Sequence, residues 1–245
     1  MISGDERYER IDALRGLAML WMAVFHFDFD LNHFGFIQPR QAFFHDPFWT
    51  WQRSVILGTF LFTAGASLAV AMSRGQTWAR FLRRWWQIVA CAVLVSLATW
   101  VVFPRAWVWF GVLHGMAVML LLTRMLSALH VPRALLLVLG VAIVLVLPLF
   151  MTPSMEATAI RWLGLGSTKP ITQDWVPLVP WMGVMLIGFA LGQWAWQHRR
   201  EWLARPVAPA FSPLVTLGQW SLSFYMVHQP LFFGVVYVAA LVFLR

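Results

Sequence analysis

Long apolar stretches without charged residues dominate this chain of 245 residues. Several of them exceed the roughly 20 residues that an α-helix needs to cross about 30 Å of hydrocarbon. The composition agrees, because 60% of the residues are hydrophobic and only 11% are charged, whereas a soluble domain averages about 25% charged residues. The stretches lack the alternation that is typical of membrane β-strands. We therefore expect an all-α protein, a polytopic transmembrane helical bundle.

Seven spans are predicted, with ends placed to within a few residues. They cover residues 11–30, 53–73, 83–103, 107–128, 133–152, 177–197 and 213–243. The last is long and contains Pro230, so we expect it to be kinked or partly outside the core. Whether it is one kinked span or two is left open. No internal repeat or linker divides the chain, and residues 1–245 are expected to form a single domain.

Basic residues are distributed unevenly between the two predicted sides of the membrane. Of the 18 basic residues in the chain, twelve fall on one side: Arg7, Arg10, Arg15, Arg74, Arg80, Arg83, Arg84, Arg124, Arg133, Arg199, Arg200 and Arg205. The opposite side has Arg40, Arg53, Arg105, Arg161, Lys169 and Arg245. The positive-inside rule then predicts a cytoplasmic N-terminus. The net charge of +8 does not predict a nucleic-acid partner, because the basic residues lie in short loops between spans.

The first predicted span has ionisable residues at both ends. Such residues are costly in a bilayer, so they are candidates for function. Asp12 and Arg15 would lie near the cytoplasm, although they are also explained as helix-start and anchoring charges. His26 and Asp30 would lie near the outer face, and they share one side of the helix with His33 if the helix continues that far.

Other polar residues are predicted in the outer half of the membrane region. His45 lies in the first outer loop, His114 in the fourth span, and Asp174 just before the sixth. Ser221, Tyr225 and His228 form a stripe on the last span, at spacings i, i+4 and i+7. A histidine beside an aspartate is suited to general base catalysis. Singly, each histidine is equally explained as an interhelical hydrogen-bonding residue.

Two further patterns concern ligands. Arg15, Arg83 and Arg84 are candidates to bind phosphate groups, because arginine matches phosphate oxygens in bidentate fashion. Anchoring to anionic lipid explains most of these arginines equally well.

A metal site at His26, Asp30 and His33 would lack a fourth ligand, so no metal is expected. Small residues of the second span, including Gly65, favour close helix packing or close approach of a ligand.

Five segments occur in an order that we recognise. They are Arg10-Ile-Asp-Ala-Leu-Arg-Gly16, Leu61-Phe-Thr-Ala-Gly-Ala-Ser67, Gly111-Val-Leu-His-Gly115, Val176-Pro-Leu-Val-Pro-Trp181 and Leu217-Gly-Gln-Trp-Ser-Leu-Ser-Phe-Tyr-Met-Val-His-Gln-Pro230. Together they resemble the heparan-α-glucosaminide N-acetyltransferase catalytic-domain family of transmembrane acyltransferases. The resemblance runs nearly from end to end of the chain.

The resemblance implies a CoA-dependent acyltransferase. Acetyl-CoA or another acyl-CoA would enter from the cytoplasm, and the acyl group would reach an amine or hydroxyl acceptor, a sugar or glycan, on the other side. The family's catalytic histidine lies in the first non-cytoplasmic loop, where His45 is the best match. His26, Asp30, His114 and His228 are expected to assist catalysis.

The same resemblance implies a donor site. Asp12, Arg15, Arg83, Arg84, Ser221 and Tyr225 are expected to hold the CoA co-substrate. The expected partners are the lipid bilayer, acyl-CoA and the acceptor, with a homodimer left open. A bacterial protein of this kind would lie in the plasma (inner) membrane. A small-molecule or lipid transporter, or a non-catalytic membrane partner subunit, would also place polar residues inside such a protein.

Overall fold

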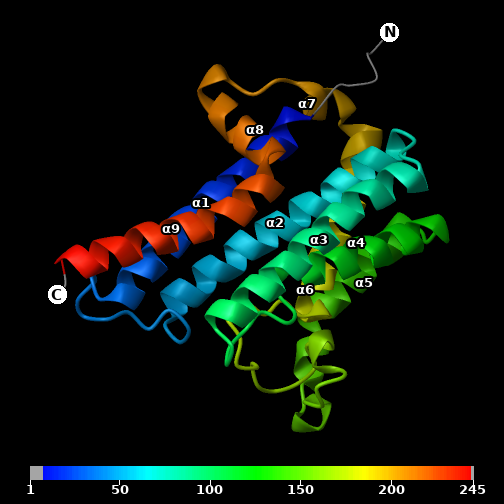
Figure 1. Ribbon diagram of the computed structural model, residues 1–245. Helices are drawn as coiled ribbons and strands as arrows, with labels where there is room; N and C mark the ends of the chain where they lie inside the picture. The colour runs from blue at the N-terminus through cyan, green and yellow to red at the C-terminus, as the bar shows by residue number, and fades with distance from the viewer. Residues whose placement is uncertain (1–7, 244–245) are drawn as a thin grey trace. The chain divides into compact units, whose positions relative to one another are not determined.

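The computed structural model describes residues 8–243, and within this range every regular element is helical (Figure 1). The α-helices are α1 Glu9–Phe34, α2 Pro47–Ser73, α3 Trp78–Val102, α4 Val112–Ala128, α5 Arg133–Leu145, α6 Leu178–His198, α7 Arg200–Ala204, α8 Ser212–Gln219 and α9 Ser221–Phe243. Short 3-10 helices cover Leu147–Phe150, Pro153–Met155, Arg161–Leu163 and Pro209–Phe211. The predicted all-α class is confirmed. Arg7 and Arg245, which entered the charge count, lie outside the described residues.

Four helices, α2, α3, α6 and α9, are long and apolar enough to cross a membrane. The chain is therefore an integral membrane protein. At 26 residues, α1 is also long enough for a span, at about 39 Å, but it is charged at both ends. The apolar helices α4 and α5 have 17 and 13 residues and are shorter. Seven spans and a cytoplasmic N-terminus remain predictions.

The helices divide into two compact units. The first unit contains the chain up to Phe60 and from Glu201 onward, and the second unit contains Leu61–Arg200. The first part of α2 belongs to the first unit and its remainder to the second. The prediction of a single domain stays a prediction.

In the first unit, α1 and α8 approach each other closely through two glycines. A side-chain carbon added at Gly16 would overlap the carbonyl oxygen of Leu214, and one added at Gly218 would overlap that of Asp12. Residue numbers fall along α8 as they rise along α1, so the two helices are antiparallel. Small residues are what allow two membrane helices to pack backbone against backbone.

The helix that follows, α9, lies beside α1 and runs in the same direction (Figure 1). The ring centroids of His26 and His228 are 5.3 Å apart, and those of Phe34 and Tyr237 are 5.8 Å apart. Residue numbers therefore rise together along both helices. With seven alternating spans, the first and the last would cross the membrane in the same direction. The parallel arrangement of α1 and α9 agrees with this expectation.

The last predicted segment, 213–243, is not one continuous helix. It is divided at Trp220, where the chain turns between α8 and α9, whereas Pro230 lies inside α9. The eight residues of α8 extend only about 12 Å, too short to cross the hydrocarbon. The segment is thus one helix of spanning length preceded by a short helix that folds back on α1.

In the second unit, the small residues of α2 serve close packing. A side-chain carbon at Gly65 would overlap the carbonyl oxygen of Met185, and one at Gly188 would overlap that of Phe62. Of the two explanations for these small residues, the structure supports close packing between helices, here α2 and α6.

Two helix starts differ from the prediction. The α2 helix begins at Pro47 and not near residue 53, because the Asp46 carboxylate accepts a hydrogen bond from Phe48 N–H at 2.8 Å and caps it. Proline at the first helical position reinforces this start. The α4 helix begins at Val112 and not at 107, because the preceding segment pairs instead with a later one through Phe110 and Trp175.

The long connection between α5 and α6 is held by polar contacts among its own residues. Ser167 donates to Glu156 at 2.7 Å, and Arg161 lies 3.6 Å from the same carboxylate. The Ser167 hydrogen bond, followed by further contacts from Thr168 and the charge of Arg161, lowers the pKa of Glu156. This loop therefore keeps a defined shape although it is largely exposed.

Replacing Gly218 with alanine should destabilise the α1–α8 contact, because the new methyl group would overlap the Asp12 carbonyl. Overpacking of this kind costs about 1–3 kcal/mol. Thermal unfolding in detergent, followed by tryptophan fluorescence, should show a lower Tm for Gly218→Ala. Gly234→Ala is the matched control, since nothing lies within 4 Å of the added carbon. Equal Tm values for both variants would contradict this packing.

Candidate functional site

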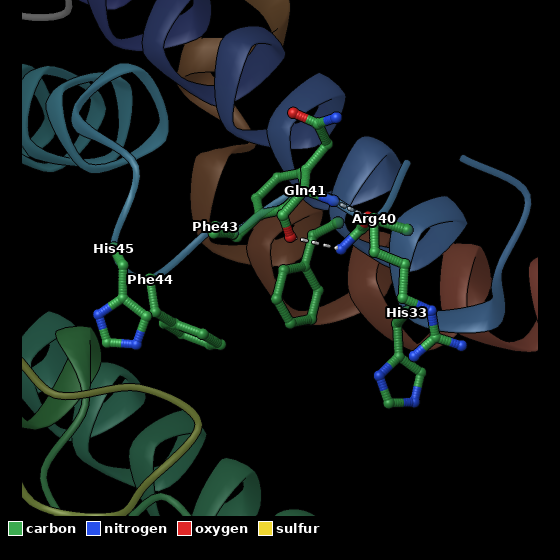
Figure 2. A pocket seen from close by; sticks show the side chains of 9 residues that line it. His33, Arg40, Gln41, Phe43, Phe44 and His45 are labelled. Atoms are coloured by element: carbon green, nitrogen blue, oxygen red, sulfur yellow. Dashed lines mark hydrogen bonds between the residues drawn. The ribbon is translucent and has the colours of Figure 1, made fainter. Parts of the chain in front are cut away.

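A pocket of about 330 Å³ lies in the first unit, between the end of α1 and the loop that leads to α2 (Figure 2). This volume is at the lower end of the range for small-molecule sites, about 300–1,000 Å³. It is lined by Phe29, Asn32, His33, Arg40, Gln41, Ala42, Phe43, Phe44 and His45. Two imidazoles, one guanidinium and several aromatic rings thus face one small space.

The Asn32 side chain attaches the loop 35–46 to α1 through two hydrogen bonds. The Asn32 amide donates to the Gln41 carbonyl at 3.0 Å, and its oxygen accepts from Gln41 N–H at 2.7 Å. Both ends of one amide are therefore used to hold the loop backbone. At the other end of the loop, the Asp46 cap fixes the start of α2. The pocket lies between these two attachment points.

Aromatic packing supports the pocket from behind. Phe43 is buried, with its ring stacked on Trp49 at 3.9 Å between centroids and edge-on to Phe25 at 5.5 Å. Phe29 contacts both Phe43 and Phe44 edge-on. Aromatic rings bring large contact area with little freedom of movement. They give the pocket a rigid apolar wall that suits the face of a ring-shaped ligand.

The polar side chains lie at two ends of the pocket. Figure 2 shows His33 and Arg40 at one end and His45, beside Phe44, at the other. His33, Arg40 and His45 are all exposed, so a ligand can reach them. Among the described residues, no carboxylate lies within ion-pair distance of Arg40. The site can therefore offer a cationic group and two imidazoles to a bound molecule.

A second polar group is buried between α1 and α9. Asp30 is fully buried, and the Gln229 amide donates to both of its carboxylate oxygens, at 3.0 and 3.2 Å. About one helical turn along α1, the His26 ring contacts the His228 ring edge-on. The structure thus brings together His26, Asp30 and His228, as their predicted depth suggested.

The orientation of His228 is set by its own helix. Its Nδ1 lies 3.1 Å from the Phe224 carbonyl oxygen and 2.9 Å from that of Tyr225. Because both partners are acceptors, Nδ1 carries a hydrogen, and in the neutral ring Nε2 is the acceptor. That Nε2 is buried and has no hydrogen-bond partner in the part of the chain that the structure describes. It is a free acceptor inside the α1–α9 contact.

His114 belongs to the second unit, where both of its ring nitrogens have partners. Nδ1 accepts from Gly111 N–H at 3.3 Å, and Nε2 lies 3.1 Å from the Ser96 hydroxyl. Ser96 in turn donates to the Val108 carbonyl, and Asp174 accepts from Val112 N–H. These contacts cap the start of α4. The expected catalytic role of His114 has no separate support in this geometry.

The residues expected to hold CoA are divided between the two units. In the first unit, Asp12 and Arg15 form an ion pair of 3.0 Å, and Arg15 also reaches the Gly218 carbonyl at 3.4 Å. Ser221 is buried and Tyr225 is half-buried at the start of α9. Arg83 and Arg84 belong to the second unit and are exposed on α3, where Arg84 donates to Gln87.

Sequence reasoning missed two features of this region. Gln229 is uncharged, and although it lies in the fifth recognised segment, only the parallel packing of α1 and α9 places it against Asp30. Arg40 was counted only for topology, although it lines the pocket. His33 was predicted to share one side of the first span with His26 and Asp30, but it was not assigned a catalytic or binding role. Within residues 8–243 no cluster of three ligand side chains could hold a metal ion.

The helical fold and the four apolar helices define an integral membrane protein, and its first unit contains a pocket of about 330 Å³. Residues 7–230 of the sequence match the family described as heparan-alpha-glucosaminide N-acetyltransferase, catalytic. The chain therefore belongs to this family of membrane acyltransferases, and the resemblance of its five ordered segments is confirmed. No curated protein and no solved structure matches the chain significantly.

Replacing Asn32 with alanine should release the loop that forms the pocket. Two hydrogen bonds to the Gln41 backbone would be lost, each contributing about 0.5–1.5 kcal/mol. Hydrogen exchange in residues 36–46 should become about 5- to 100-fold faster in Asn32→Ala. Gln41→Ala is the control, because Gln41 bonds to Asn32 through its backbone only. Unchanged exchange in Asn32→Ala would show that the loop is held in another way.

Proposed function

We propose that the chain is an integral membrane acyltransferase. It moves an acetyl or other acyl group from cytoplasmic acyl-CoA to an amine or hydroxyl acceptor, a sugar or glycan, on the extracytoplasmic side. The family match over residues 7–230 carries this proposal. The pocket supports it, because it gathers imidazoles and aromatic rings in the loop where the family resemblance expects the catalytic histidine.

The acceptor occupies the pocket in this proposal. The ring of a sugar would lie against Phe44 or Phe29, whose edge-on contact holds the two rings in place, with the buried Phe43 behind them. Gln41, Arg40 and His33 offer hydrogen bonds at the rim. Pockets that join an apolar wall with a few polar groups are typical of small-molecule sites.

His45 is the proposed general base. Its exposed imidazole takes a proton from the acceptor nitrogen or oxygen as that atom attacks the thioester carbonyl carbon. The new C–N or C–O bond forms, the C–S bond breaks, and the CoA sulfur leaves and is protonated. His33, at the other end of the pocket, is the second candidate because it faces the same space.

The remaining predicted residues take supporting roles. Asp30 supplies negative charge near the pocket residues of α1, and His26 and His228 form the polar contact beside it. His114 positions the start of α4. Ser221 and Tyr225 lie at the start of α9, and Asp12 and Arg15 hold α1 to α8 through their ion pair and the Gly218 carbonyl. Arg83 and Arg84 are exposed and suited to the phosphates of CoA.

The proposal also includes the membrane in which the protein acts and its oligomeric state. A bacterial chain of this kind would act in the plasma membrane, as a monomer or a homodimer. No metal enters the proposed chemistry, since the thioester is already an activated acyl donor.

His45→Ala should reduce kcat by about 10²–10⁴-fold, the usual contribution of a general base. The purified protein would be supplied with acetyl-CoA and a panel of sugars and amino sugars, and thiol release would be followed. His198→Ala is the control, because His198 is an exposed histidine at the end of α6. Full activity in His45→Ala would exclude it as the base. Binding without thiol release by the unmodified protein would favour a transporter or partner subunit.

A further inference from the structure

Asp30 is a buried carboxylate without a cationic partner. It is fully buried, and no arginine, lysine or histidine of the described residues lies within ion-pair distance of it. Among residues 8–243, its hydrogen-bond donor is the Gln229 amide. A carboxylate in such a place is stabilised chiefly by the hydrogen bonds that it accepts. Its position therefore depends on one neutral side chain.

The geometry of that contact fixes the carboxylate plane. Gln229 Nε2 lies 3.0 Å from Oδ1 and 3.2 Å from Oδ2, so one NH₂ group is shared nearly equally between both oxygens. A donor centred between the two oxygens resists rotation of the group in either direction. The Gln229 carbonyl oxygen is itself buried and has no partner among the described residues. If the Gln229 amide were removed, no other hydrogen-bond donor seen among the described residues would hold the Asp30 carboxylate.

Asp30 lies in the same turns of α1 as three pocket residues, although it does not line the pocket itself. Its neighbours Phe29, Asn32 and His33 all line the pocket. His33 follows Asp30 by three residues, a spacing at which helical side chains are neighbours. His33 also contacts Phe233, one turn beyond Gln229 on α9, with ring centroids 6.1 Å apart. Gln229 and Phe233 are four residues apart, so one face of α9 contacts both the Asp30 carboxylate and the pocket histidine His33.

We propose that Gln229 is a positioning residue, which holds the Asp30 carboxylate so that its negative charge acts on the His33 end of the acceptor pocket. This role rests on the proposed acyltransfer in that pocket. A fixed negative charge one helical turn from a histidine favours one orientation of its ring and of a polar ligand bound there. Gln229 contributes no atom to the reaction and acts only through Asp30.

Single variants test the position of the carboxylate. Gln229→Leu removes the donor, and Gln229→Glu replaces it with a second carboxylate of the same shape. We expect either change to lower kcat by about 10- to 100-fold, as misplaced groups do, with KM for the acceptor within about threefold. Gln197→Leu is the matched control, because Gln197 is an exposed glutamine of α6. Unchanged kcat in Gln229→Glu would overturn the proposal.

A double variant separates positioning from a purely structural contact. In Asp30→Asn combined with Gln229→Glu, the amide and the carboxylate exchange places while the shapes and the net charge are kept. We expect the exchange to restore the Tm lost in Gln229→Glu but to leave kcat low, because the carboxylate no longer lies on α1. Recovery of kcat together with Tm would show that the pair is only structural.

The assay also separates this proposal from the proposed function. The unmodified protein must first release thiol in the presence of an acceptor. If it does not, the acyltransferase proposal fails. If it does, and the Gln229 variants match it in kcat, only the positioning role fails.

Discussion

Hydrocarbon contains no water to hydrogen-bond a polar side chain, so each polar group within a membrane helix needs a partner in the protein. This constraint explains most of the polar contacts described above. Asp30 receives both of its hydrogen bonds from Gln229, His228 donates to carbonyls of its own helix, and His114 uses both ring nitrogens at the start of α4. Buried polar atoms without a hydrogen-bond partner among the described residues, such as His228 Nε2, are therefore exceptions to this pattern.

The same constraint explains why the candidate residues that a ligand can reach lie near a loop. The chain leaves α1 at Gly35, turns through the loop 35–46 and begins α2 at the Asp46 cap. There side chains can be exposed to a ligand and still be held by a rigid aromatic wall. The buried carboxylate of Asp30 lies one turn inside the helix, where it can influence the pocket without being hydrated. In the proposed function, the exposed pocket would hold the acceptor and the buried carboxylate would support it from within the helix.

The sequence predicted the helical class, the helical segments and the polar side of α1, because apolar length and i, i+4 spacing are local properties. It also predicted that the first and last spans run in the same direction. It did not predict the break at Trp220, because a short apolar helix and a continuous span have the same composition. Gln229 and Arg40 could not be assigned either, since their roles depend on which helix or loop lies opposite. The start of α2 was predictable in principle from Asp46 and Pro47, a cap followed by a proline.

Transfer of an acyl group across the membrane, as proposed, can be measured in sealed vesicles of known orientation. Inverted membrane vesicles would carry the acceptor inside, and acetyl-CoA labelled in its acetyl group would be added outside, to the cytoplasmic face. We expect a labelled acceptor inside the vesicles and an equal amount of free CoA outside. Label that enters the acceptor only when both substrates are on the same side, or no labelled acceptor at all, would contradict it.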